Sequence, residues 1–166
     1  MTRTLIVSLS ITSALVLATS AFASAGHPGG GVAAFGQPGD VKKISRTVRI
    51  EATEIKYNLT DLTFKVGETV KFVFVNKGEQ DHELSLGDSV TQLKHRKMMQ
   101  DMAAMPNMDM SKMPGHQGMD DDTMLMTKPG EAKELVWQFT KAGTFEFACN
   151  YPGHAEVGMT GKIVVR

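Results

Sequence analysis

The sequence is short of cysteine and has no excess of charge of either sign. Cys149 is its single cysteine, so no disulfide can form within the chain. The 18 basic residues balance the 18 acidic ones, and the formal net charge at pH 7 is zero. This balance gives no electrostatic field for nucleic acid or for an anionic membrane, so neither is expected as a partner.

A long hydrophobic run occurs only once, near the N-terminus. Residues 5–18 are apolar apart from Ser and Thr, follow Arg3, and precede small-x-small sequences that end at Ala23 and Ala25. This pattern predicts a secretory signal peptide over residues 1–25, cleaved after Ala23 or Ala25. An uncleaved anchor is disfavoured because the run is short for a bilayer span. We therefore expect an exported mature chain with no membrane insertion.

Export makes the lone thiol informative. An oxidising compartment favours paired cysteines, and Cys149 has no partner in its own chain. Such a thiol is buried and inert, bridged to another chain, or bound to a ligand, and its sequence neighbours must decide which.

The mature chain is long enough for one domain with a hydrophobic core. Residues 26–46 are rich in Gly and Pro at their start and lack periodicity, so they are predicted to form a flexible arm. The domain itself is predicted over residues 47–166. Within this domain, the segment from about residue 88 to about residue 130 lacks the alternating apolar pattern found on both sides of it. We interpret this segment as an insertion.

Alternating apolar residues predict about seven short strands with turns between them. The apolar positions are Val48, Ile50 and Ala52; Leu62, Phe64 and Val66; Val70, Phe72 and Phe74; Leu84 and Leu86; Leu135, Trp137 and Phe139; Phe145 and Phe147; and residues 161–165. Many short strands with little helix predict an all-β, antiparallel sandwich.

The segment from Cys149 to Met159 carries the clearest chemical pattern. A thiolate at the end of a strand is followed five residues later by His154 and after five more by Met159. A trigonal site of one Cys and two His with a weak axial Met is the geometry of a blue copper centre. The second histidine must come from another segment, and His82, just before a predicted strand, is the natural candidate.

Other interpretations of Cys149 explain less of the pattern. A catalytic nucleophile needs a base and a third group that orients it, and the nearest histidine lies on the same turn. A structural zinc site would normally contain more cysteine or histidine and no methionine. A plain core cysteine leaves His154 and Met159 without a role.

These residues resemble the cupredoxins, the plastocyanin- and azurin-like blue copper proteins. The resemblance rests on residues 68–76, on residues 82–84, and on the loop of residues 149–159. It implies a Greek-key β-sandwich with one type 1 copper, in which His82, Cys149 and His154 are equatorial ligands and Met159 is the axial ligand. Asn76 resembles the family's asparagine that ties the ligand loops together.

The methionines of the insertion raise the question of further copper. Ten of the twelve lie between Met98 and Met126. The spacing of His95, Met98, Met99, Met102 and Met105 predicts one face of a short helix that Pro106 ends, and the methionines that follow look like part of a loop.

Soft thioethers select Cu(I), so the insertion is a candidate for additional copper. Methionine packing on an amphipathic helix and a disordered spacer are the alternatives. His27 is a further candidate, because a histidine beside a free amino terminus can chelate Cu(II), although a solvated tail histidine is the favoured interpretation. The candidate additional ligands are His27, His95, Met98, Met102, Met105, Met108, Met110, Met113 and His116.

The chain also looks similar to methionine-rich cupredoxins of bacterial copper tolerance. This resemblance implies a monomeric periplasmic protein that cycles Cu(I) and Cu(II) in copper handling, with copper export or handling proteins as partners. The alternative is a one-electron carrier between redox partner proteins. A copper-dependent oxidase is disfavoured because one cysteine and five histidines cannot build a multicopper cluster. We therefore expect no enzymatic activity.

Overall fold

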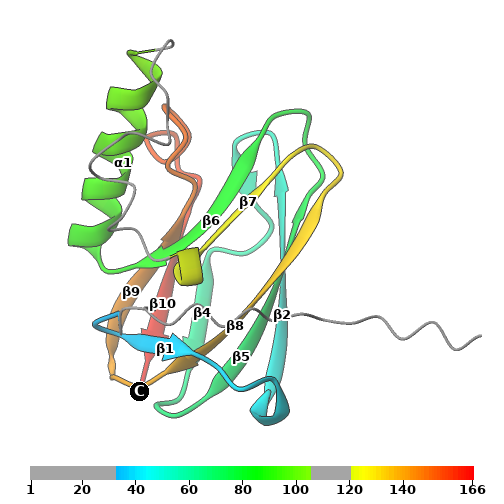
Figure 1. Ribbon diagram of the computed structural model, residues 1–166, viewed down its shortest axis with the longest axis vertical. Coiled ribbons are helices and arrows are strands. Elements are labelled where there is room, and N and C mark those ends of the chain that lie inside the picture. Colours follow the sequence, from blue (N-terminus) through cyan, green and yellow to red (C-terminus); the bar gives the residue numbers. More distant parts are fainter. Residues whose placement is uncertain (1–32, 106–120) are drawn as a thin grey trace, which may run out of the picture.

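Two five-stranded sheets lie face to face in the computed structural model, which describes residues 33–105 and 121–166 (Figure 1). The first sheet has the order β1-β8-β5-β2-β3 and the second β4-β10-β9-β6-β7. The strands of the first sheet are β1 Gly36–Pro38, β2 Arg46–Thr53, β3 Lys56–Tyr57, β5 Thr69–Asn76 and β8 Ala132–Phe139. Those of the second are β4 Asp61–Phe64, β6 His82–Gly87, β7 Met124–Thr127, β9 Gly143–Ala148 and β10 Thr160–Val165. The predicted all-β sandwich is confirmed.

The sandwich is mixed and not antiparallel, which corrects the prediction of strand direction. β2 pairs with β5 in parallel, and β4 pairs with β10 in parallel. The chain reaches β5 from β2 by way of β4 in the opposite sheet, and this crossover is what a parallel pair requires. Periodicity of two predicts a strand but carries no information about its direction.

Alternating apolar side chains form the core between the sheets. Ile50 of β2 and Phe72 of β5 are fully buried, and they belong to a cluster that includes Phe64 of β4 and Phe147 of β9. Phe64 stacks on Phe139, with ring centroids 4.6 Å apart. The predicted strands therefore meet through the apolar faces that their sequence pattern indicated.

One helix, α1 (Ser89–Ala103), packs against β6 and β9. Asp88 caps its start by accepting a hydrogen bond from the Thr91 amide at 2.7 Å, and the helix ends shortly before Pro106. The predicted helix is confirmed, but its methionines do not share one buried face. Met99 is buried, whereas Met105 lies beyond the helix and is 44% exposed. Within residues 33–105 and 121–166, no helix has the length and apolar character needed to cross a membrane.

Two segments differ from the irregular structure predicted for them. Phe35, inside the predicted flexible arm, is buried against Trp137 and Phe145, and β1 pairs with β8. A short 3-10 turn, η1 (Val41–Lys43), follows it. The Phe35 ring and the pairing of β1 with β8 together anchor this Gly- and Pro-rich segment, and sequence periodicity does not detect either contact.

The end of the insertion is also ordered differently from the prediction. A 3-10 turn, η4 (Asp121–Thr123), leads into β7, which pairs antiparallel with β6. Met124 and Met126, predicted to lie in a loop, are therefore strand residues. The predicted signal peptide lies outside the described residues. Five candidate copper ligands do so as well, namely His27, Met108, Met110, Met113 and His116.

Gly161 tests the packing of β9, the strand that directly precedes Cys149. It pairs with Phe147 across β10 and β9, and a Cβ at Gly161 would lie 2.0 Å from Phe147 Cζ. We expect Gly161→Ala to lower the free energy of unfolding by about 1–3 kcal/mol, because the buried ring must shift. Urea denaturation of the copper-free protein measures this value. Lys162→Ala, at the exposed neighbouring position, should change it by less than about 0.5 kcal/mol. Equal stability of Gly161→Ala and the parent would contradict this packing.

Candidate metal centre

His82 is the first residue of β6 and is fully buried. The loop that leads to it is held by Asn76, whose Oδ1 accepts from the Gly78 amide at 2.8 Å and whose Nδ2 donates to the Gln80 carbonyl at 2.7 Å. Asn76 Nδ2 also donates to the carbonyl of Thr127 at 3.2 Å, and Thr127 Oγ1 donates to the His82 carbonyl. Asn76 therefore ties the loop before His82 to β7, the strand beside β6.

The remaining predicted ligands come from the loop that joins β9 to β10, residues 149–159, which we call the ligand loop. Its two ends meet where the Cys149 amide donates to the Met159 carbonyl at 3.1 Å. Inside the loop, the Met159 amide donates to the His154 carbonyl at 3.0 Å. Gly153 and Gly158 take positive φ values of 87° and 99°, a conformation that favours glycine. The loop is therefore a tight, hydrogen-bonded turn that presents its side chains from fixed positions.

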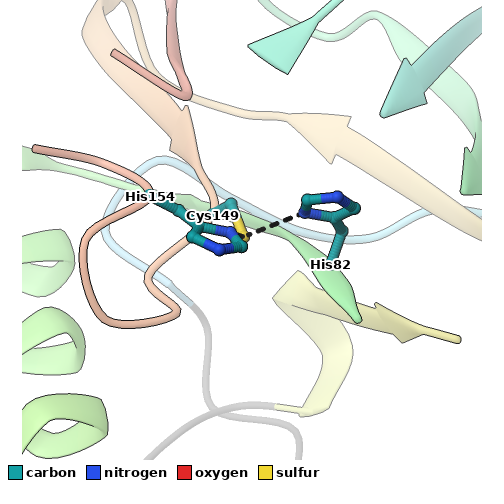
Figure 2. Close-up of side chains that lie close together, drawn as sticks. All are labelled: His82, Cys149 and His154. Atoms are coloured by element: carbon teal, nitrogen blue, oxygen red, sulfur yellow. Dashed lines mark hydrogen bonds between the residues drawn. The ribbon is translucent and has the colours of Figure 1, made fainter. Parts of the chain in front are cut away.

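The structure brings three of the predicted ligands together (Figure 2). Cys149 Sγ lies 3.3 Å from His154 Nδ1 and 3.9 Å from His82 Nδ1. The ligand atoms of all three residues lie within 4.8 Å of one another. Met159 is fully buried at the end of the same loop. A thiol and two imidazole nitrogens, converging from a strand and a loop, form a donor set that suits copper.

Burial sets the protonation state of these donors. It lowers the pKa of His82, with a further lowering from the nearby His154, and it lowers the pKa of His154 as well. Both imidazoles are therefore neutral at pH 7 and ready to bind a metal. Burial raises the pKa of the Cys149 thiol to about 12. The thiol is thus protonated without metal, and binding as a thiolate must release its proton.

The same raised pKa bears on the alternative in which Cys149 acts as a nucleophile. Reactive cysteines have a lowered pKa and are partly exposed, because the thiolate is the attacking form. Cys149 is fully buried, with a raised pKa. The environment of Cys149 is therefore that of a metal ligand or an inert thiol, and not of a catalytic one.

Sequence reasoning missed two buried polar residues that follow the ligands. Glu83 comes directly after His82, and its backbone N–H donates to Cys149 Sγ at 3.5 Å. Asn150 comes directly after Cys149, and both its backbone N–H and its side-chain N–H donate to Glu83 Oε1, at 2.8 and 3.0 Å. Burial raises the Glu83 pKa to about 7, against the lowering effect of these Asn150 donors. The sequence did contain one signal for Glu83, because an acidic residue is unusual within a short, otherwise apolar strand.

His95 lies in this same region and not among exposed methionines. It is 3% exposed, and burial lowers its pKa to about 4, with a smaller contribution from the charge of Arg96. Its predicted neighbours on the helix, Met98 and Met102, are partly exposed. Burial therefore distinguishes His95 from Met98 and Met102, whereas Met99 is buried like His95.

Comparison with known proteins agrees with this donor set. The family described as copper binding proteins of the plastocyanin/azurin family matches residues 44–166. The copper-resistant cuproprotein CopI of Rubrivivax gelatinosus is 40% identical, over 92% of each chain. The proteins of the same name from Pseudomonas aeruginosa and Vibrio cholerae are 36% and 38% identical, each over 80% of this chain and over 83% and 73% of their own.

Solved structures show the same fold at lower identity. Auracyanin B superposes with a TM-score of 0.58 at 20% identity, covering 81% of this chain and 96% of its own. The auracyanin of Roseiflexus castenholzii superposes with a TM-score of 0.57 at 22% identity, covering 74% and 98%. The buried cluster of His82, Cys149 and His154, with Met159 beside it in sequence, is consistent with a type 1 copper site. The chain belongs to the plastocyanin/azurin family of copper-binding proteins, the cupredoxins.

Proposed function

We propose that this chain is a periplasmic type 1 copper protein that cycles between Cu(I) and Cu(II) in copper handling and tolerance. The observation that carries the proposal is the convergence of His82, Cys149 and His154 in a chain whose relatives are named copper-resistant cuproproteins. His82, Cys149 and His154 are the proposed equatorial ligands, and Met159 is the proposed axial ligand.

The protein part of the site supports one-electron chemistry. Copper bound to these residues would supply a Cu(II)/Cu(I) couple. The chain contributes a fixed set of donors, because the ligand loop is closed by its own backbone hydrogen bonds and Asn76 holds the approach to His82. The four proposed ligand side chains are all buried, which keeps water away from their donor atoms. A donor set that does not rearrange serves both oxidation states and favours rapid electron transfer.

An electron carrier between redox proteins is the second candidate, and one feature of the ligand loop favours it. Val157, between His154 and Met159, is 66% exposed. Val157 lies on the loop that carries three of the proposed ligands, so a redox partner that contacted it would sit close to the copper. The two candidates share their copper chemistry and differ in the partner, which is a copper export or handling protein in one and a redox protein in the other.

Deletion of the gene distinguishes the two candidates. We expect the deletion strain to stop growing at a lower copper concentration than the parent strain, with unchanged respiration and unchanged zinc tolerance. The wild-type gene should restore copper tolerance, and a Cys149→Ser gene should not, because it lacks the thiolate. Unchanged copper tolerance together with slower respiration would reject copper handling in favour of electron transfer.

The candidate methionines of the insertion, which do not include Met126, are proposed to bind additional Cu(I) through their thioethers. Replacement of Met108, Met110 and Met113 by leucine keeps the side chains apolar but removes the sulfur atoms. We expect this triple variant to bind less Cu(I) per chain, measured by competition with a Cu(I)-specific chelator, and to keep its Cu(II) site. Met126→Leu, at a 40% exposed position of β7, is the control. An unchanged Cu(I) stoichiometry in the triple variant would remove this part of the proposal.

A further inference from the structure

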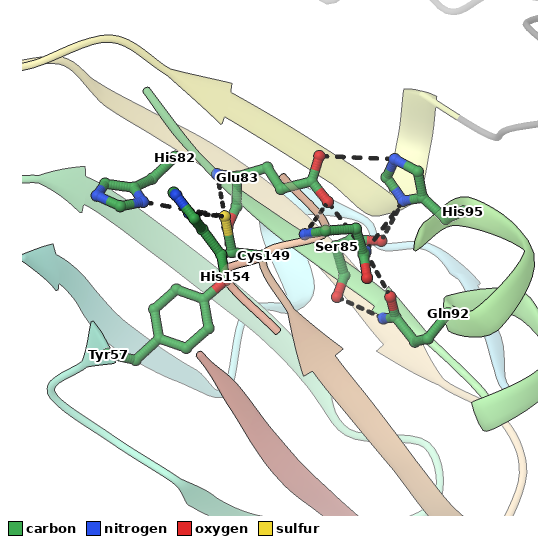
Figure 3. Close-up of polar contacts among 9 residues, drawn as sticks. Tyr57, His82, Glu83, Ser85, Gln92, His95, Cys149 and His154 are labelled. Carbon is green, nitrogen blue, oxygen red and sulfur yellow. Dashed lines mark hydrogen bonds and ion pairs between the residues drawn. The ribbon is translucent and has the colours of Figure 1, made fainter. Parts of the chain in front are cut away.

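A cluster of buried polar side chains lies between α1, β6 and the ligand loop (Figure 3). We call it the buried polar cluster, and its members are Glu83, Ser85, Gln92, His95 and Asn150. Each is at most 5% exposed, and none is among the four proposed type 1 copper ligands. Buried polar groups are costly unless they are hydrogen-bonded, so a cluster of this size requires a structural or functional reason.

The centre of the cluster is the link between Glu83 and Asn150. Each follows a proposed copper ligand in the sequence, and the Glu83 carboxylate accepts two hydrogen bonds from Asn150. The segment that carries His82 is thereby fastened to the segment that carries Cys149. The Glu83 N–H that donates to Cys149 Sγ belongs to the same residue, so its position depends on this link.

Helix α1 completes the link with Gln92. Gln92 Oε1 accepts from Asn150 Nδ2 at 2.8 Å. Gln92 Nε2 donates to the Ser85 carbonyl of β6 at 2.8 Å and to the Glu146 carbonyl of β9 at 3.3 Å. One helix side chain therefore contacts both strands behind the ligands and orients the amide of Asn150.

His95 faces the other side of the carboxylate. Its Nδ1 lies 3.2 Å from Asn150 Nδ2, which can only donate, and 3.3 Å from Ser85 Oγ. Asn150 Nδ2 has two hydrogens for three acceptors, Glu83 Oε1, Gln92 Oε1 and His95 Nδ1, so these acceptors share its N–H groups. A proton on Nδ1 would face this donor, so in the neutral ring we place the proton on Nε2. Nε2 lies 3.6 Å from Glu83 Oε2, a buried oxygen without a hydrogen-bond partner in the described part of the chain. His95 thus directs an N–H group at the unsatisfied oxygen.

We propose that Gln92 and His95 of α1 are positioning residues for the copper centre, which hold Glu83 and Asn150 and thereby keep the Glu83 N–H against Cys149 Sγ. The inference rests on the proposed copper site. A hydrogen bond to the sulfur withdraws electron density from the thiolate and stabilises Cu(I) relative to Cu(II). Loss of either helix side chain loosens this donor and therefore favours Cu(II).

The test is the midpoint potential of copper-loaded Gln92→Leu and His95→Leu. At a fixed ambient potential we expect the ratio of Cu(I) to Cu(II) to fall about threefold to tenfold, and a tenfold fall lowers the potential by about 59 mV. His95→Gln keeps an N–H donor and should recover most of the shift. Gln100→Leu is the matched control, because Gln100 lies on the same helix but bonds at the surface to Glu156 of the ligand loop.

A readout on the copper-free protein accompanies the potential. The Asn150 amide should exchange its hydrogen faster in Gln92→Leu and His95→Leu than in the parent, because its acceptor Glu83 is held less firmly. An unchanged or raised potential in both leucine variants, or an equal shift in Gln100→Leu, would overturn the inference. A parent protein that develops no thiolate-to-copper band would instead reject the copper site itself.

Discussion

The site depends on the hydrogen bonds that join the segment of His82 to the segment of Cys149. His82 begins β6, and Cys149 directly follows β9, which lies beside β6 in the same sheet. The Glu83 N–H donates to Cys149 Sγ, and the Asn150 N–H donates to the Glu83 carboxylate. Each segment therefore fixes the other at the residues next to the ligands. The thiol and the two imidazoles are held within 4.8 Å of one another as a result.

These hydrogen bonds require the Glu83 carboxylate to be buried, and its burial is unfavourable in free energy unless polar groups surround it. Removal of a carboxylate from water is expensive unless several donors face it. Two donors come from Asn150, and α1 supplies His95 on the other side. Tyr57 of β3 adds a hydrogen bond to the Glu83 carbonyl from the opposite sheet. The helix therefore does more than cover β6, because it completes the polar environment behind the metal donors.

The sequence predicted the ligand loop well because its residues are contiguous. The spacing of Cys149, His154 and Met159, with Gly153 in the turn, describes the whole loop in one segment. His82 had to be inferred from strand order and from the resemblance to cupredoxins. The paired sheets, α1 and most of the strands were also predicted from periodicity and helix signals.

The parts that were missed depend on contacts between distant residues. Phe35 is anchored by Trp137, about a hundred positions away, and no local pattern indicates this. Gln92, His95 and Asn150 meet only after α1 has docked, so no spacing predicts their cluster with Glu83. The periodicity of apolar residues does not predict strand direction either, because the direction of β5 relative to β2 depends on the crossover through β4.

The most direct test of the copper centre is a titration of the mature protein with Cu(II), followed by visible absorption. The account predicts an intense thiolate-to-copper band that saturates at one Cu(II) per chain. The band should be lost in Cys149→Ser, which keeps the size of the side chain but lacks the sulfur. Absence of the band from the parent protein, or its survival in Cys149→Ser, would contradict the account.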